Sequence, residues 1–215
     1  METIPVINCP DFECVKKRVK QIKELGSPLA HIDVSDGEFA KPANWGNPLD
    51  LLSFGEELAG LKLEVHLMVL EPQAVVEDWL RAGVSRIIIH EEALTDGWPI
   101  IFDKIDTYDA ELGLAIKPET SIETVVPYLK QVSLVQILAV DPGPSGQKFD
   151  MAVLEKISFL NKEKEDNNFI IEVDGGIDLE TAALVRDAGA DLVVSHSYIF
   201  ESSDPKEAYE SLKNL

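Results

Sequence analysis

The chain has 215 residues, 45% of them hydrophobic and 27% charged, values that are ordinary for a globular protein with one sizeable core. Its formal net charge of −20 argues against nucleic acids and anionic membrane surfaces as partners, because both are bound through Lys and Arg. No apolar stretch approaches the ~20 residues of a membrane span, and residues 1–5 do not resemble a signal peptide.

Apolar runs alternate with amphipathic segments about eight times along the chain. The runs predict strands over residues 5–7, 29–33, 62–68, 86–90, 113–116, 134–140, 169–173 and 192–195. The segments between them predict helices over residues 11–25, 48–59, 72–82, 96–108, 121–129, 151–164, 179–188 and 205–212. Alternation of this kind is typical of a parallel sheet, and eight units favour an α/β fold with a closed (β/α)8 TIM barrel.

No Ser-, Gly- or Pro-rich linker divides the chain, so we expect residues 1–215 to form a single domain. The rival architecture is a doubly wound open sheet. It lacks support because no GxGxxG turn follows the first predicted strand.

The two cysteines, Cys9 and Cys14, have a spacing that suits neither a CxxC redox motif nor a zinc clip. We therefore expect two free thiols in a cytoplasmic protein, where the environment is reducing.

Several predicted strands end in residues that are typical metal ligands. His31 and Asp33 lie two positions apart and share one face of a strand, and His66 and Asp174 stand at equivalent places on other strands. Strand ends converge on one face of a barrel, and that face carries the chemistry. A mixed imidazole and carboxylate set favours Zn, Fe(II), Mn or Co over Ca or Mg.

Four motifs at residues 32–39, 65–68, 140–149 and 172–177 resemble, in order and spacing, those of the ribulose-phosphate 3-epimerase family. The resemblance covers nearly the whole chain. It implies a barrel of the ribulose-phosphate-binding type and one divalent metal ion. It also implies interconversion of D-ribulose 5-phosphate and D-xylulose 5-phosphate in the pentose phosphate pathway. The resemblance further implies assembly into a homo-oligomer.

The resemblance also assigns roles to residues. The metal ligands would be His31, Asp33, His66 and Asp174, and the two aspartates would be the acid/base pair. Epimerisation at C3 removes a proton from one face of the sugar and returns one to the other, so two carboxylates would flank a planar enediolate.

Substrate contacts are implied in the same way. Backbone N–H groups in glycine-rich turns would hold the phosphate against the global negative charge. The substrate- and phosphate-binding positions are His66, Met68, Gly143, Gly146, Gly175, Gly176, His196 and Ser197. For each glycine the alternative is a turn that needs positive φ.

The chain departs from the family pattern at several positions expected on the same face of the barrel, where the strands end. The departures are Val6 for a serine, Ser35 and Leu138 for methionines, Glu38 for a histidine and Pro144-Ser145 for Phe-Gly. Asn8 shares the face of Val6 and is placed to compensate for the lost hydroxyl. Lys41 and Lys148 are the nearest basic candidates, and His90 is expected to support the site rather than to bind metal.

The sharpest departure is His196, where the family has glycine. The imidazole either obstructs the approach of a phosphate or replaces lost contacts to it. The resemblance makes pentulose 5-phosphate the leading substrate, while His196, Pro144 and Glu38 favour competitors. The alternatives are another ketose, either a hexulose phosphate or an unphosphorylated sugar, and a non-catalytic sugar-binding or regulatory paralogue.

Overall fold

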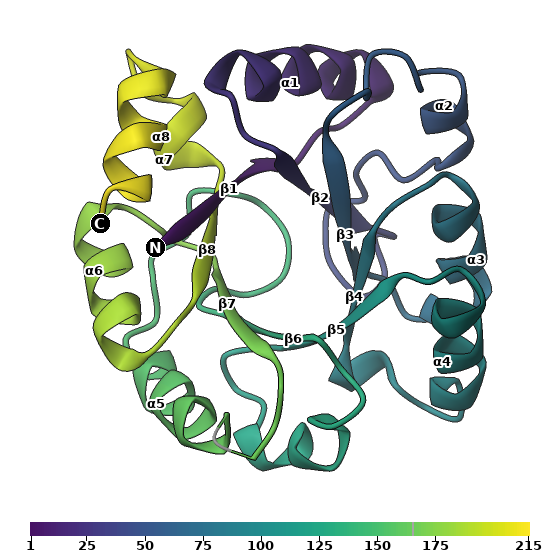
Figure 1. Cartoon of the computed structure of the whole chain (residues 1–215), viewed down its shortest axis with the longest axis vertical. Coiled ribbons are helices and arrows are strands. Elements are labelled where there is room, and N and C mark those ends of the chain that lie inside the picture. Colours follow the sequence, from purple (N-terminus) through teal and green to yellow (C-terminus); the bar gives the residue numbers. More distant parts are fainter. Residues whose placement is uncertain (165) are drawn as a thin grey trace.

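Eight parallel strands form a closed barrel in the computed structural model, which describes residues 1–164 and 166–215 (Figure 1). The strands are β1 (Glu2–Ile7), β2 (Leu29–Ser35), β3 (Lys62–Met68), β4 (Arg86–His90), β5 (Glu111–Ile116), β6 (Leu134–Leu138), β7 (Ile170–Asp174) and β8 (Leu192–Ser195). Each pairs with its neighbour in sequence, and β1 pairs with β8 to close the ring. The predicted (β/α)8 TIM barrel is confirmed.

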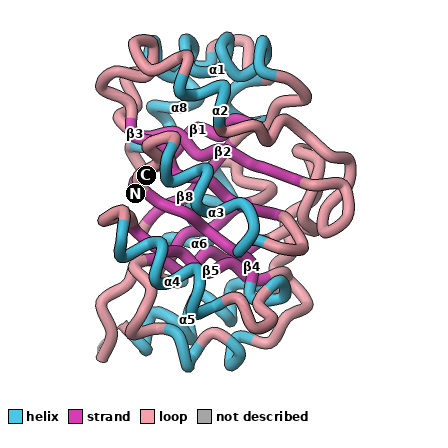
Figure 2. Tube along the Cα trace, turned by 90° about the vertical axis from the view of Figure 1, so that its right-hand side faces the viewer, coloured by secondary structure: helices cyan, strands magenta, loops and turns pink. Residues whose placement is uncertain are grey.

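Helices surround the barrel, and Figure 2 shows the strands running inside this shell. The helices are α1 (Phe12–Leu25), α2 (Leu49–Leu52), α3 (Pro72–Arg81), α4 (Trp98–Thr107), α5 (Val153–Glu163), α6 (Leu179–Ala188), α7 (Ser197–Phe200) and α8 (Pro205–Lys213). Side-chain caps start several of them: Asp11 accepts a backbone N–H at the start of α1, and Asp178 and Thr181 form a capping box on α6. None of the described helices has the length and apolarity to cross a membrane.

Strand alternation sends apolar and polar side chains to opposite sides of the sheet. On β3, Val65 and Leu67 belong to the large core between strands and helices, whereas Glu64 and His66 point into the barrel. The interior therefore contains an unusual number of fully buried polar side chains: His31, Glu64, His66, His90, Gln136 and Glu172. Buried groups of this kind need partners, and their pairing positions the site described below.

Two predicted helices are wrong. Residues 48–59 contain only the single turn α2, followed by turns, and Gly55 lies where that helix would have continued. Residues 121–129 form two 3₁₀ turns, Ile122–Thr124 and Val126–Tyr128, because Pro127 lacks the N–H that an α-helix would use. Both segments are connections on the outside of the barrel, so the parallel strand order is unaffected.

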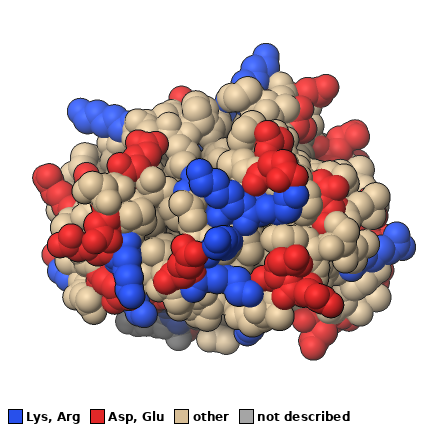
Figure 3. Space-filling model, turned by 90° about the horizontal axis from the view of Figure 1, so that it is seen from above, with Lys and Arg blue, Asp and Glu red and all other residues tan. Residues whose placement is uncertain are grey.

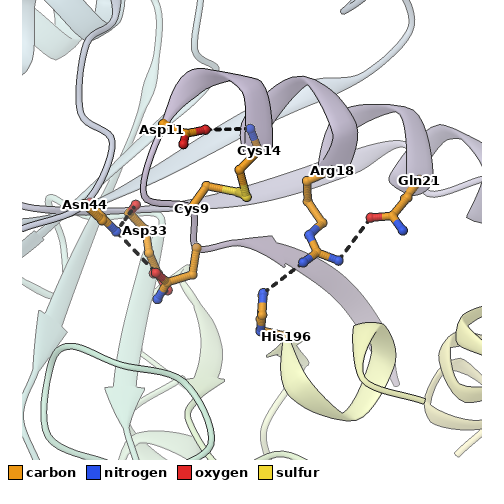
Figure 4. The surroundings of a disulfide bond; sticks show 9 residues. Cys9, Asp11, Cys14, Arg18, Gln21, Asp33, Asn44 and His196 are labelled. Atoms are coloured by element: carbon orange, nitrogen blue, oxygen red, sulfur yellow. Dashed lines mark hydrogen bonds between the residues drawn. A yellow bond between two sulfur atoms is a disulfide. The ribbon is translucent and has the colours of Figure 1, made fainter. Parts of the chain in front are cut away.

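The expectation of two free thiols is also wrong. Cys9 and Cys14 form a disulfide, with their Cα atoms 5.6 Å apart. Cys9 follows β1 and Cys14 lies in the first turn of α1, so the chain reversal between strand and helix brings the two side chains together (Figure 4).

Candidate active site

Four side chains of metal-ligand type meet at the carboxyl end of the barrel. His31 and Asp33 come from β2, His66 from β3 and Asp174 from β7, and one ligand atom from each lies within 4.8 Å of those of the others. Parallel register places Asp33 beside His66. Asp33 Oδ1 lies 3.3 Å from His31 Nε2 and 3.2 Å from His66 Nδ1. The structure thus brings together all four predicted ligands.

Glu64 and Arg86, which lie deeper in the barrel, fix the orientation of His31. Its Nδ1 lies 2.8 Å from Glu64 Oε1, and Arg86 Nη1 donates to Glu64 Oε2 at 2.6 Å. Because a carboxylate only accepts, Nδ1 carries a proton. Nε2 is buried and makes no hydrogen bond, and it faces the carboxylates at the mouth. An imidazole whose outer nitrogen is held by a carboxylate is a typical metal ligand.

A second chain of hydrogen bonds fixes His66. Glu92 Oε2 lies 2.9 Å from His90 Nδ1, and His90 Nε2 lies 2.9 Å from His66 Nε2. The carboxylate assigns the proton of His90 to Nδ1, so His90 Nε2 accepts and His66 carries its proton on Nε2. The lone pair of His66 Nδ1 is then directed at Asp33 and Asp174. His90 supports the site, as the sequence suggested.

Burial and charge shift the pKa values of His31 and His66 in opposite directions. Burial lowers the pKa of His31, but Asp33 and Glu64, whose carboxylates approach its two ring nitrogens, and the charge of Glu172 more than offset this, so that the pKa lies well above its usual value. Burial dominates at His66 and lowers its pKa to about 4. His31 thus holds a proton among the carboxylates, and His66 is neutral.

The pKa values of Asp33 and Asp174 are also shifted in opposite directions. Burial raises the pKa of both, but the imidazoles of His31 and His66, which approach Asp33 closely, outweigh burial and bring the pKa of Asp33 below the usual range. Burial and the neighbouring charge of Asp33 raise the pKa of Asp174 to about 7. One carboxyl group is ionised while its partner can hold a proton, which is the division of roles that an acid/base pair needs.

A pocket lies above these groups. Its walls include Val6, Met68 and Leu138 on strands, the 141–147 and 175–177 turns, and His196 and Ser197. Asn8 also lines it and donates to Asp33 Oδ2 at 3.1 Å. The substrate-contact residues predicted from the sequence, apart from the more deeply buried His66, all line this pocket.

The glycines of the pocket also have structural reasons. Gly175 has φ of 99°, and a Cβ there would lie 2.4 Å from Val140 Cγ2. Gly176 has φ of 66°, and its Cβ would meet the backbone of Phe149. Turn geometry therefore accounts for both residues, whether or not their N–H groups hold a ligand.

Sequence reasoning missed the polar layer below the ligands. Glu64 and Glu172 lie two residues before His66 and Asp174, so the period of two could have placed both inside the barrel. Burial and the charge of Glu64 raise the pKa of Glu172 well above its usual value, and Gln136 donates to it. Among the basic candidates, Lys41 and Lys148 do not line the pocket.

Comparison with known proteins places this barrel among enzymes of one family. The model of the ribulose-phosphate 3 epimerase family matches residues 3–200. The ribulose-phosphate 3-epimerase of Chlamydia trachomatis is 37% identical over 92% of this chain and 85% of its own length. That of Bacillus subtilis is 32% identical over 99% of this chain and 98% of its own length.

A solved structure shares the fold at a greater distance. A 3-hexulose-6-phosphate synthase superposes with a TM-score of 0.75 over 100% of this chain and 99% of its own, at 14% identity. At that identity the likeness concerns the barrel and not its chemistry.

Proposed function

Because the chain belongs to the ribulose-phosphate 3-epimerase family, and so is an isomerase acting on carbohydrates, we propose that it interconverts D-ribulose 5-phosphate and D-xylulose 5-phosphate by epimerisation at C3. One observation carries the mechanism: Asp33 and Asp174 lie at the floor of the mouth pocket with their pKa values shifted in opposite directions. Two carboxyl groups in different protonation states are what a two-base epimerisation requires.

The residues fit a divalent metal ion. The buried, unpartnered Nε2 of His31 and the lone pair of His66 Nδ1 face the two carboxylates, and this nitrogen and oxygen set suits Zn, Fe(II), Mn or Co. When bound, such an ion supplies Lewis-acid stabilisation of negative charge on the sugar oxygens.

Asp33 and Asp174 move the proton. The ionised carboxylate takes the C3 proton from one face of the ketose, and the protonated carboxyl group of its partner delivers a proton to the opposite face of the enediolate. The reverse reaction exchanges their roles. Asn8, by donating to Asp33 Oδ2, orients that carboxylate toward the pocket.

The apolar walls keep the reacting carbon dry. Val6, Met68 and Leu138 line the pocket beside the aspartates and are buried. Exclusion of water strengthens the hydrogen bonds and charges that act on the substrate. The phosphate end of the substrate would lie toward the glycine turns and Ser197, where backbone N–H groups can hold it.

A coupled assay tests the proposal. Purified protein, loaded in turn with Zn, Fe(II), Mn and Co, should convert D-ribulose 5-phosphate to D-xylulose 5-phosphate, and a chelator should abolish turnover. Silence of a protein that binds metal tightly would contradict the substrate assignment and favour another ketose or a non-catalytic role.

Single substitutions test the two-carboxylate mechanism. Asp33→Asn and Asp174→Asn should each lower kcat by about 100-fold or more, within the range that general acid/base catalysis supplies. The exposed Asp103→Asn on α4 is the matched control and should keep full activity. Wild-type turnover in both aspartate variants would rule out the mechanism. Exchange of the C3 proton in heavy water shows which face each carboxylate serves.

A cytoplasmic location, a single domain over residues 1–215 and assembly into a homo-oligomer remain predictions.

A further inference from the structure

Helix α1 concentrates positive charge on an otherwise acidic chain. It carries Lys16, Lys17, Arg18, Lys20 and Lys23. Figure 3, which looks down on the side of the molecule where α1 lies in Figure 1, shows Lys and Arg gathered in the middle of that face with Asp and Glu around them. Arg18 differs from the exposed Lys17 and Lys20 because its side chain is half-buried and turned toward the strand ends (Figure 4).

The guanidinium of Arg18 is held in place by three neighbours. Nη1 donates to Gln21 Oε1 at 3.1 Å, and the guanidinium carbon lies 3.7 Å from the ring centroid of Phe200. Nη2 lies 3.4 Å from His196 Nε2. A guanidinium fixed in this way keeps its position when a ligand arrives, so little conformational entropy is lost on binding.

Arg18 nonetheless lacks a carboxylate partner. The chain has 39 acidic residues, yet within residues 1–164 and 166–215 no ion pair includes Arg18. Glu201 acts on Arg18 only through longer-range charge. The Nε atom of Arg18 is buried without a hydrogen-bond partner. A half-buried cation without a counter-ion is costly, and an anion from outside the chain would remove that cost.

The contact with Arg18 sets the tautomer of His196. A guanidinium can only donate, so His196 Nε2 accepts and the proton lies on Nδ1. Burial and the charge of Arg18 lower the pKa of His196, which keeps the ring neutral. Nδ1 is buried and has no acceptor, although His196 lines the mouth pocket. A residue of the pocket wall therefore carries a buried N–H donor without a partner.

Backbone geometry leaves the side chain free for such a role. His196 has φ of −105°, a value open to any residue, so the loop itself does not demand glycine at this position. The imidazole adds a donor to a wall that includes Asp33, Asp141 and Asp174 and, among the residues that line it, no Lys or Arg. An anionic ligand needs local compensation in such a pocket.

We propose that His196 and Arg18 are specificity-determining residues for the phosphate of the substrate, His196 as the donor through Nδ1–H and Arg18 as the positioning residue that fixes its tautomer and supplies charge. This inference rests on the proposed function, since it concerns the same pocket. Of the two sequence-based alternatives for His196, it corresponds to the one in which the imidazole replaces lost contacts.

Arg18→Met is the first test, and Lys17→Met on the same helix is the control with the same change in charge. Arg18→Met should raise KM for ribulose 5-phosphate, and the inhibition constant of inorganic phosphate, by about 10-fold, because the His196 donor to a charged group loses its fixed tautomer and a neighbouring positive charge is removed. Its kcat should stay within a factor of about two, because the aspartates are untouched. Lys17→Met should change neither constant. Unchanged constants in Arg18→Met would overturn the inference.

His196→Ala and His196→Asn form the second test, and it stands even if Arg18→Met does not fold. Alanine removes the donor and should weaken phosphate binding by about 10-fold or more. Asparagine keeps an N–H donor near the place of Nδ1 and loses the contact with Arg18, so it should restore part of the binding. In the His196→Ala background, Arg18→Met should cost less than in the wild type, because the two residues act as a pair. Equal binding by wild type and His196→Ala would overturn the inference.

Calorimetry with inorganic phosphate separates this inference from the proposed function, because it needs no turnover. Phosphate binding that depends on Arg18 and His196, in a protein inactive on ribulose 5-phosphate, would support the anion site while contradicting the function. Full turnover with constants insensitive to both residues would support the function and overturn the anion site.

Discussion

Glu64→Gln should weaken metal binding although Glu64 is not itself among the four candidate ligands at the mouth. Both carboxylate oxygens of Glu64 accept from obligatory donors, Oε1 from His31 Nδ1 and Oε2 from Arg86 Nη1. The amide replaces one oxygen by an NH2 group that must face a donor. If it faces His31, the proton of the imidazole moves to Nε2 and blocks the lone pair needed for a metal ion.

The size of the effect follows from the position of Glu64. Loss of a carboxylate that orients a histidine ligand typically lowers metal affinity by about 10- to 100-fold, which corresponds to about 1.4 to 2.7 kcal/mol. Glu64 is completely buried, so water cannot replace the missing acceptor. Glu64 also raises the pKa of His31, so its removal relieves competition from protons at low pH. The deficit should therefore grow as the pH rises.

Competition against a chromophoric chelator measures the Kd for Zn at several pH values. Glu111→Gln is the matched control: Glu111 is paired with the same Arg86, at 2.7 Å, but is exposed and does not contact His31. Circular dichroism checks that both variants keep the barrel. Equal affinity in Glu64→Gln and wild type, or an equal loss in both variants, would refute the argument that Glu64 acts through His31.

Three further predictions concern stability, each measured by urea unfolding. In metal-free protein, Asp174→Asn should raise the free energy of unfolding more at pH 8 than at pH 4. The pKa of about 7 in the folded state lies above the unfolded value of 3.8, so the stability that the protonated carboxyl gives is present below pH 3.8 and is lost as the pH rises through 7, at most about 4 kcal/mol. Gly176→Ala should cost about 2 kcal/mol, because its φ is positive and the added Cβ would lie 2.8 Å from Phe149 N; a neutral result would show that the 175–177 turn is free to move. Cys9→Ser should lower the free energy of unfolding by about 2 kcal/mol, because the lost crosslink closes only a short loop. A reducing agent should lower the stability of the wild type by the same amount and leave that of the variant unchanged.

The barrel and its cluster of four candidate metal ligands could be predicted because each depends on local pattern. Continuous Val, Ile and Leu runs such as residues 86–90 predict buried parallel strands, and their number predicts closure. The ligands lie at strand ends, and the period of two places His31 and Asp33 on one face. No long-range information was needed beyond the convergence of strand ends at one face of a barrel.

The supporting contacts could not be predicted because they join distant parts of the chain. Arg18 reaches His196 across 178 positions, and nothing near Arg18 in the sequence distinguishes it from the lysines around it. The cysteines were misjudged because spacing alone does not give the Cα separation, which the turn between β1 and α1 sets. The two wrong helices fall where Gly55 and Pro127 interrupt otherwise amphipathic segments.

The site combines a shortage of positive charge inside the barrel with an unpaired positive charge near the opposite wall of the pocket. Inside the barrel, Asp33, Asp174, Glu64 and Glu172 lie around His31, and of the four Arg86 is ion-paired with Glu64. The pKa values of Asp174, Glu172 and His31 are raised as a consequence. Protons there partly neutralise the charge, and a divalent ion can replace them, because its ligands must lose their protons to bind it. Near the other wall, within residues 1–164 and 166–215, Arg18 is a cation without a carboxylate partner and His196 Nδ1 has no acceptor. A ketose phosphate has the complementary features: oxygens beside the reacting carbon can bind a cation, and the phosphate at the other end of the molecule is an anion. Under the proposed function, that match outweighs the net charge of −20 and lets a strongly acidic chain select an anionic sugar.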